Sequence, residues 1–256
     1  MILASILITD NENEEIVLPA KVVKNIDSFK RVHPGLSHKL FTRASIRQFI
    51  KQHFDSEVLK SFEKLKPFAY QADLARHCIM YVNGGVYADL SIYFFGPWSP
   101  KYLMSLEHPH ESMPSNVERL GLFRDFQSSS TWDTVIGIYS SPPRHRSLLL
   151  AIQMICENVK REYYGINSLC PTGPAVFGKA VASTCYPEDV IVGDSKWIAP
   201  RDKLNQLITE NSHGFVFRNK IVAIRRKRGG GSLAEVGITG GNQYPEMWSL
   251  RKIYGV

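Results

Sequence analysis

The chain has 256 residues, of which 44% are apolar, and it carries a formal net charge of +7 at pH 7. This length is enough to bury one substantial core and too short for two, which predicts a single domain over residues 1–256. No apolar run approaches the roughly 18 residues that a membrane-spanning helix needs. The apolar start, Met1 to Ile8, lacks the basic residues of a signal peptide and is interpreted as a buried strand.

The four cysteines are widely spaced, and no pair shows the Cys-x-x-Cys spacing of a zinc or redox site. We interpret Cys78, Cys156, Cys170 and Cys185 as free thiols. Free thiols are typical of a reducing compartment, so we expect a cytoplasmic protein.

The first 41 residues alternate between strand and helix patterns. Residues 2–9 predict a strand, and Val22 to Phe29 predict a short helix with apolar side chains at helical spacing. A turn at His33-Pro34-Gly35 precedes a second predicted strand, Leu36 to Phe41. This alternation favours an α/β architecture with a central sheet.

The segment after Pro67 has the pattern of an α-helix. Its apolar positions follow one another at steps of four and three: Phe68, Ala72, Ala75, Ile79 and Val82. Asp73, Arg76 and His77 fall outside this stripe at i, i+3 and i+4, so we expect them to point together into one pocket. Asn83-Gly84-Gly85 ends the helix, because glycine adopts the left-handed conformation of a helix C-terminus.

The next segment, Val86 to Phe95, alternates between apolar and polar residues and predicts one strand. In such a strand Asp89 and Ser91 project from the same face. A carboxylate on an apolar strand requires a polar or cationic partner. Asp89 therefore binds a ligand, pairs with Arg76, or lies at a solvent-facing strand end.

The rest of the chain is less regular. Either a lid or an ordinary surface loop is expected between Glu107 and Pro114. Trp132-Asp133, just before a predicted strand, either contacts an acceptor or serves as an edge and cap. The further predicted elements are a strand at Asp133–Tyr139, a helix at Arg144–Val159, a turn at Cys170–Pro174 followed by a helix, and strands at Phe215–Arg218 and Ile221–Arg226.

The central block, from Ala72-Asp73-Leu74-Ala75-Arg76 through Gly84-Gly85-Val86-Tyr87-Ala88-Asp89-Leu90-Ser91, resembles the signature of glycosyltransferase family 32. In that family a helix with Asp-x-x-Arg leads through Gly-Gly-x-Tyr into Asp-x-Asp. Weaker similarity extends over Pro19–Phe41, Asp133–Pro143 and Thr172-Gly173-Pro174. The family's usual His and Trp after the first strand are absent here.

The resemblance implies a GT-A (Rossmann-like) nucleotide-sugar transferase fold and a retaining transfer from a nucleoside diphosphate sugar. It places the donor-binding region at about 68–98 and a loop that closes over the diphosphate at about 225–256. The residues that it implies as catalytic are Asp73, Arg76, Asp89 and Asp133. Those implied in donor binding are Gly84, Gly85, Tyr87, Ser91, Asn242 and Trp248, although Trp248 is equally consistent with a packed terminal tail.

One position departs from the family pattern, because Asp89-Leu90-Ser91 stands where the family has Asp-x-Asp. The resemblance implies Mn²⁺ or Mg²⁺ held by Asp89 and Ser91, and a hydroxyl is the weaker ligand of the two. Three alternatives stay open: the metal takes another ligand from the C-terminal loop, the enzyme needs little metal, or the chain is an inactive relative. Without a tightly bound metal, we expect Arg225, Lys227 or the Gly240 loop to supply part of the positive charge.

The expected partners are the nucleoside diphosphate sugar donor and a glycan or lipid-linked sugar acceptor, in surface polysaccharide synthesis. The basic run Arg225–Arg228 is either a solvated turn or a contact to the inner face of a membrane. Two other classes of function stay open. A nucleic-acid-binding protein is disfavoured because the basic run has no interleaved aromatic residues, and a non-catalytic nucleotide-sugar-binding scaffold requires a turnover assay to exclude.

Overall fold

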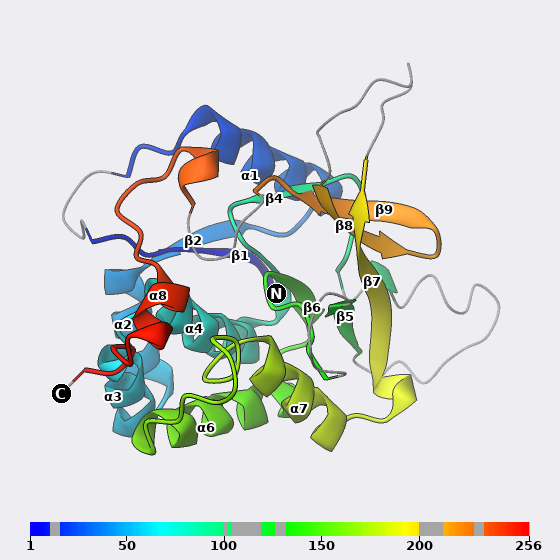
Figure 1. The fold of residues 1–256 in the computed structure, drawn as a ribbon. Helices are drawn as coiled ribbons and strands as arrows, with labels where there is room; N and C mark the ends of the chain where they lie inside the picture. Colours follow the sequence, from blue (N-terminus) through cyan, green and yellow to red (C-terminus); the bar gives the residue numbers. More distant parts are fainter. Residues whose placement is uncertain are drawn as a thin grey trace.

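The computed structural model describes residues 1–10, 16–99, 102–103, 119–125, 132–199, 212–227 and 233–255. Within these ranges the strands form one nine-stranded mixed sheet in the order β2-β1-β3-β6-β5-β7-β8-β9-β4 (Figure 1). The strand β1 runs parallel to β2 and β3, and β5 runs parallel to β7. The strands are β1 Ile2–Leu7, β2 His38–Thr42, β3 Gly85–Ala88, β4 Ile92–Phe94, β5 Leu120–Asp125, β6 Ile138–Ser141, β7 Val190–Ile198, β8 Ser212–Phe217 and β9 Lys220–Arg225.

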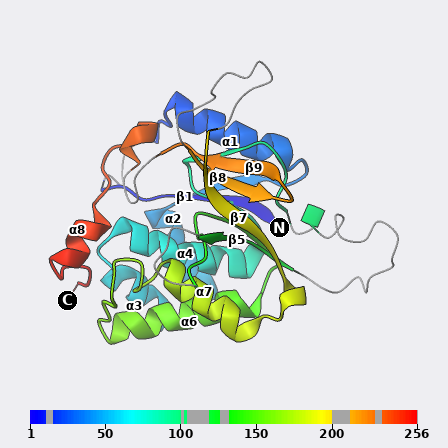
Figure 2. The ribbon, with the colours of Figure 1, turned by 45° about the vertical axis from the view of Figure 1, so that its right-hand side comes forward.

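Helices pack on both faces of the part of the sheet that contains β1. A layer that contains α2, α3, α4, α6 and α7 lies below it in Figure 1, and α1 lies above it; Figure 2 shows the same two layers from another side. The helices are α1 Ala20–Val32, α2 Arg43–His53, α3 Ser56–Lys64, α4 Phe68–Asn83, α6 Arg146–Lys160, α7 Pro174–Thr184 and α8 Tyr244–Ser249, with short 3₁₀ turns η1 Pro187–Asp189 and η2 Ala234–Val236.

The strand β1 shows why the sheet has a helix layer on each side. All six of its residues are buried. Ile2, Ala4 and Ile6 belong to the core shared with α4 and α6, whereas Leu3 belongs to the core on the other side, with Phe29 of α1. A strand that is apolar on both faces has to be covered on both faces. The predictions of a strand and a helix at the start of the chain are confirmed, with the helix longer at both ends.

The helix α4 begins after Pro67 and ends at Gly84, as predicted. The cap is not the left-handed helical conformation that was expected: Gly84 combines a φ of 60° with a ψ of −177°, which is open almost only to glycine. The predicted single apolar stripe is wrong. Buried residues occur on every side of α4, and they include the polar side chains Asp73, Arg76 and His77. The helix lies between β1 and α6, so its polar residues point into the interior of the protein and need partners there.

The predicted strand from Val86 to Phe95 is wrong as a single element. It is interrupted by a tight turn in which the N–H of Ile92 donates to the carbonyl of Asp89 at 2.9 Å. The two resulting strands separate completely: β3 is third in the sheet order and β4 is last, paired with β9. Because a turn of three residues spans roughly 10 Å at most, the sheet curls until its β4 edge returns to β3. We call the Asp89–Ser91 turn the seam.

Other differences concern boundaries. Only the last two residues of the predicted strand Asp133–Tyr139 lie in a strand, β6, which continues to Ser141, and Thr134 forms only an isolated bridge with Arg124. The β8–β9 hairpin turns at Arg218-Asn219, whose φ angles of 46° and 61° are typical of a two-residue hairpin loop. The helix predictions after residue 143 and after the Thr172-Gly173-Pro174 turn are confirmed, as α6 and α7.

Three further expectations concern a loop, the cysteines and membrane-spanning helices. The loop at 107–114 lies outside the described residues. All four cysteines are described, and each is a free thiol, as the spacing predicted. In the described part of the chain, none of the helices has the length and apolar character required to span a membrane.

Candidate active site

A pocket of about 330 Å³ opens beside the carboxyl ends of β1 and β3, and Ile8 and Asp89 line it there. Its volume is in the range of small-molecule sites. Further lining comes from α4, the segments 135–137 and 168–174, the end of β9 and the C-terminal segment 233–244. Ligands of open α/β sheets bind outside the carboxyl ends of the strands, so this is the expected place for a donor site.

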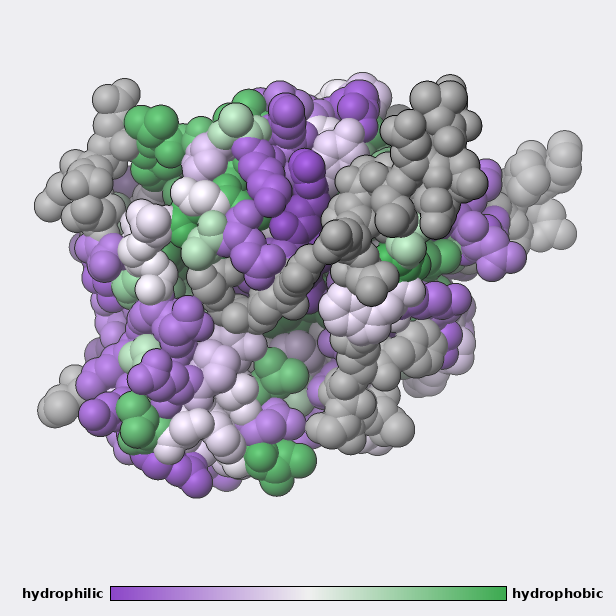
Figure 3. Space-filling view, turned by 45° about the horizontal axis from the view of Figure 1, so that its top comes forward, coloured by the Kyte–Doolittle hydropathy of each residue, from purple (hydrophilic) through white to green (hydrophobic). Residues whose placement is uncertain are grey.

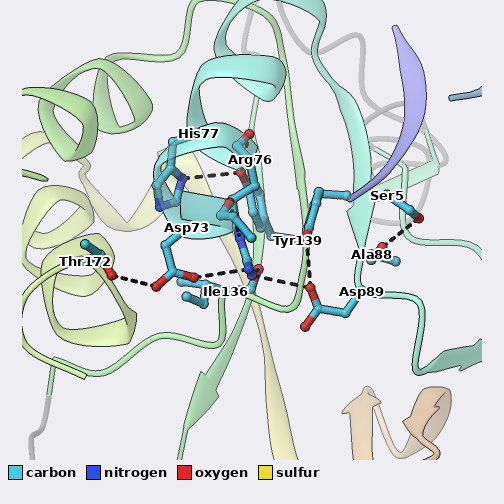
Figure 4. Close-up of polar contacts among 11 residues, drawn as sticks. Ser5, Asp73, Arg76, His77, Ala88, Asp89, Ile136, Tyr139 and Thr172 are labelled. Carbon is cyan, nitrogen blue, oxygen red and sulfur yellow. Dashed lines mark hydrogen bonds and ion pairs between the residues drawn. The ribbon is translucent and has the colours of Figure 1, made fainter. Parts of the chain in front are cut away.

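Arg76 is the centre of a polar network at the pocket (Figure 4). Its Nη2 lies 3.1 Å from Asp73 Oδ1, and its Nη1 lies 3.5 Å from Asp89 Oδ1. The same side chain donates to the carbonyl oxygens of Ile136 at 2.8 Å and Ala72 at 3.1 Å. Arg76 is thus held on four sides and fixes the two carboxylates relative to each other.

Tyr87 provides a second support for Asp89. Its hydroxyl donates to Asp89 Oδ1 at 2.8 Å, and the Arg76 guanidinium lies 4.8 Å from the centre of its ring. Burial raises the pKa of Tyr87 well above its ordinary value, which keeps the phenol protonated as a donor. The side chain of Asp89 remains 26% exposed, against 8% for Asp73. Asp89 is therefore the carboxylate that a ligand reaches more easily.

Asp73 is almost enclosed. The hydroxyl of Thr172 donates to its Oδ2 at 2.8 Å. Burial raises the pKa of Asp73 from 3.8 to about 6, although Arg76 and the Thr172 hydrogen bond oppose the rise. Burial lowers the pKa of Arg76, but Tyr87, Asp89 and Asp73 raise it by more, so the guanidinium stays charged. The ionised form of Asp73 prevails above about pH 6.

A glycine allows the Asp89 carboxylate to lie against the backbone. A Cβ built on Gly137 would lie 2.7 Å from Asp89 Oδ2 and 3.4 Å from Arg225 Nη2. The carbonyl of Gly137 also accepts the N–H of Asp89 at 2.9 Å. The backbone of Gly137 therefore lies against the Asp89 carboxylate and near Arg225, and a side chain at this position would displace the carboxylate.

The C-terminal segment forms one wall of the pocket, through Gly241, Asn242 and Tyr244 among others. Asn242 accepts the N–H of Phe68 at 2.9 Å and donates to the carbonyl of Lys66 at 3.0 Å, so it joins this segment to the start of α4. The expectation that Asn242 belongs to the site agrees with this position. A closing motion of the segment over a diphosphate stays a prediction.

Several residues implied by the resemblance lie outside the pocket lining. Gly84 and Gly85 are at the opposite end of β3, where a Cβ on Gly85 would lie 2.0 Å from the carbonyl oxygen of Ile2. Trp248 packs on the core and donates from Nε1 to the carbonyl of Tyr164 at 2.8 Å. Gly85 therefore allows β3 to pack closely on β1, Gly84 allows close packing on Pro142 and Pro143, and Trp248 anchors the terminal helix.

His77 and Asp133 also lie outside the pocket lining. His77 is fully buried away from the pocket lining, with its Nδ1 3.3 Å from the hydroxyl of Tyr139. Burial lowers its pKa to about 3, so it is neutral. Asp133 is 4% exposed, and its backbone carbonyl accepts the N–H of Asp125. Neither side chain lines the pocket, so a direct role in chemistry stays a prediction for Asp133 without geometric support.

Ser91 does not share the orientation of Asp89, because the seam turns the chain between them. Its side chain is 0% exposed and lies outside the pocket lining, and its hydroxyl has no hydrogen-bond partner among the described residues. No group of three potential His, Cys, Asp or Glu ligands occurs in the described part of the chain. Asp89 Oδ1 is already engaged by Tyr87 and Arg76. These donors do not fit an Asp-x-Asp metal centre.

The side of the pocket formed by β5, β7 and β8 contains none of the residues that the sequence predicted for the site. Trp197 is 53% exposed, lines the pocket and stacks on His213 at a centroid distance of 5.2 Å. Asp125, at the end of β5, lines the same side. No motif marks these residues, because they meet through sheet pairing alone. The exposure of Trp197, which could have drawn attention to this side, is visible only in the structure.

Residues 19–104 match the model of a glycosyltransferase sugar-binding region containing a DXD motif. We call residues 19–104 the family 32-type region, after the resemblance described above. Asp73, Arg76, Tyr87 and Asp89 all lie within this region, as the resemblance implied. The positions of Arg225, Trp197 and Asn242 lie beyond it.

Two curated relatives and one solved structure are similar to the chain. An uncharacterized glycosyltransferase, L373 of Acanthamoeba polyphaga mimivirus, is 29% identical over 75 residues, which cover 29% of this chain and 30% of the relative. The putative glycosyltransferase HOC1 of Saccharomyces cerevisiae is 29% identical over 105 residues, which cover 40% of this chain and 25% of the relative. The alignments thus span under a third of each relative.

The solved structure of PaToxG glycosyltransferase superposes with a TM-score of 0.50 at 13% identity, over 71% of this chain and 68% of that one. At this identity the similarity concerns the fold alone. The predicted GT-A fold of the family 32-type region and its surrounding sheet is confirmed.

Proposed function

We propose that the chain is a glycosyltransferase that moves a sugar from a nucleoside diphosphate sugar to a hydroxyl acceptor. The observation that carries the proposal is the Asp73–Arg76–Asp89 network, which lines the pocket and comes from the family 32-type region. Its carboxylates are suited to accept hydrogen bonds from sugar hydroxyls. Arg76 and Tyr87 act as positioning residues, because they fix Asp89 from two sides.

The proposed transfer retains the anomeric configuration, following the family resemblance. The bond from the anomeric carbon to the diphosphate oxygen breaks, and its electron pair leaves with the diphosphate. The acceptor oxygen forms the new bond and gives its proton to the departing diphosphate. The protein holds the donor and acceptor in reactive positions and excludes water from the apolar part of the pocket, which includes Ile8, Leu233 and Ile238.

We further propose a glycan or lipid-linked acceptor, as in surface polysaccharide synthesis, and a cytoplasmic enzyme that contacts the inner face of the membrane. The outer face of α1 supports the second point, since Lys21, Lys24, Lys30 and Arg31 are exposed there and Asp27 is the only acidic residue of the helix. Figure 3, with the top of Figure 1 turned forward, shows hydrophilic residues gathered on this side. Basic residues near an anionic surface contribute about 1 kcal/mol each.

The test combines binding with turnover. UDP, GDP and CMP are first screened for thermal stabilisation, and release of the free nucleotide is then measured from the corresponding sugar donors. Asp89→Asn should abolish release, whereas Asp27→Asn removes a carboxylate from the exposed face of α1 and should leave it unchanged. Stabilisation without release from any donor would favour a non-catalytic scaffold, and equal rates for Asp89→Asn and the native chain would refute the proposed role of Asp89.

A further inference from the structure

We propose that Arg225 and Lys227 bind the diphosphate of the donor and supply the positive charge that a divalent cation supplies in an Asp-x-Asp site, so that donor binding needs no metal. This inference rests on the proposed function, since it assumes a nucleoside diphosphate donor. The residues at the expected metal site differ from those that a metal requires. The region that should hold a metal has one accessible carboxylate, Asp89, and a buried hydroxyl, Ser91.

The seam brings the basic end of β9 to Asp89. In the β4–β9 pairing Arg225 lies opposite Ile92, the residue that follows the seam, and the N–H of Arg226 donates to the carbonyl of Ser91 at 2.8 Å. Arg225 and Lys227 both line the pocket. A point on Gly137 that is 2.7 Å from Asp89 Oδ2 is also 3.4 Å from Arg225 Nη2. The Arg225 guanidinium and the Asp89 carboxylate therefore both lie close to the backbone of Gly137.

Residues of β8 hold the Arg225 side chain in its orientation. Its Nη1 lies 3.4 Å from His213 Nδ1, and His213 Nε2 lies 2.7 Å from the hydroxyl of Ser195. Burial, together with the charge of Arg225, lowers the pKa of His213, so the imidazole is neutral and accepts from the guanidinium. The guanidinium also lies 5.7 Å from the ring centre of Phe215. Arg225 is thus held in place before any ligand binds.

Among the described residues, the cationic side chains that line the pocket are Arg76, Arg225 and Lys227, and they differ in their surroundings. Arg76 is engaged by two carboxylates and two carbonyls and has little capacity left for a phosphate. Among the described residues, no ion pair joins Arg225 to a carboxylate. Burial lowers the pKa of Lys227, and the negative charge of Asp89 opposes this shift; a bound diphosphate would act in the same direction as Asp89. Guanidinium binds phosphate through two parallel hydrogen bonds, and ammonium binds it as a point charge.

The chemical step balances without a metal. As the bond to the anomeric carbon breaks, its electron pair adds negative charge to the diphosphate. The positive charges of Arg225 and Lys227 stabilise that charge where it forms. Fixed positive groups in a partly buried site are effective in this role because they need no rearrangement during the reaction.

Titration of the full chain with UDP and with GDP by calorimetry tests the inference, in EDTA and in Mn²⁺. We expect binding in EDTA that Lys227→Met weakens by about 10-fold to 100-fold. Arg225→Met should weaken binding similarly, and Arg225→Lys should restore part of the loss. Lys220→Met is the matched control, because it removes one positive charge from the exposed start of the same strand and should bind like the native chain.

The outcomes separate the two proposals. Binding that requires Mn²⁺ and is unchanged in Lys227→Met and Arg225→Met would overturn the inference and leave the glycosyltransferase proposal intact. Binding in EDTA that both variants retain would overturn the assignment of these two residues. Absence of binding to either nucleotide, with and without Mn²⁺, would overturn both proposals. Unfolding curves of each variant without nucleotide confirm that the fold is kept.

Discussion

Replacement of Ser91 by aspartate tests whether this position faces the pocket or the interior. The family pattern predicts that an aspartate here gains a metal ligand, whereas the structure buries Ser91 completely. A carboxylate in this place has to take up a proton to avoid an unpaired buried charge. At pH 7, protonating a group with an ordinary pKa of about 3.9 costs about 4 kcal/mol. We therefore expect Ser91→Asp to lower the free energy of unfolding by about that amount and Tm by about 10 °C.

The assay is urea and thermal unfolding at pH 7 and at pH 5. Because the buried carboxyl has a raised pKa, the penalty shrinks as the pH falls, to about 1.5 kcal/mol at pH 5. Ser91→Ala is the control and should stay within about 1 kcal/mol of the native chain, since it removes a hydroxyl without a described partner. Native stability of Ser91→Asp at pH 7, together with a rise of Tm on adding Mn²⁺ to this variant only, would refute the reasoning.

Three further predictions concern the polar network. Gly137→Ala should displace the Asp89 carboxylate and lower donor turnover about 10-fold or more, while Gly96→Ala, whose Cβ meets nothing within 4 Å, should leave turnover unchanged. Tyr87→Phe removes the 2.8 Å hydrogen bond to Asp89 and should lower turnover about 10-fold with little change in nucleotide affinity; an unaltered rate would remove Tyr87 from the network. Asp73 has a pKa raised from 3.8 to about 6, so its contribution to stability is complete below pH 3.8 and is lost as the pH rises through about 6. If the ionised form acts in catalysis, the rate should fall below about pH 6, and a pH–rate profile of Asp73→Asn should lack that limb.

Local patterns were enough to predict the elements whose signals are local. The ends of α4 follow from Pro67 and Gly84, which respectively disfavour a preceding helical turn and permit the positive φ at its end. The strand β1 follows from an apolar run of the right length. The common orientation of Asp73 and Arg76 toward the pocket follows from their spacing of three on a helix. Each of these inferences uses residues that are neighbours in the sequence.

Long-range pairing explains what the sequence did not reveal. The alternation from Val86 to Phe95 is real, but a tight turn at Asp89–Ser91 breaks it, because the two halves pair with different strands. The prediction that Ser91 projects from the same face as Asp89 is consequently wrong. The contact between Arg225 and the Asp89 region depends on the β4–β9 pairing, which no local periodicity encodes. Trp197 and His213 enter the pocket through the β7–β8 pairing for the same reason.

The seam also has a consequence for the order in which the molecule folds. The pairing of Ile92 with Arg225 joins residues that are far apart in sequence, and closing so long a loop carries a high entropic cost before any contact offsets it. We infer that the β4 edge closes late in folding, after β1, β3 and α4 have packed. Hydrogen exchange at Ile92 and Phe94 should then be faster than at Leu3 and Val86, so that opening of this edge dismantles the pocket while the rest of the sheet stays folded.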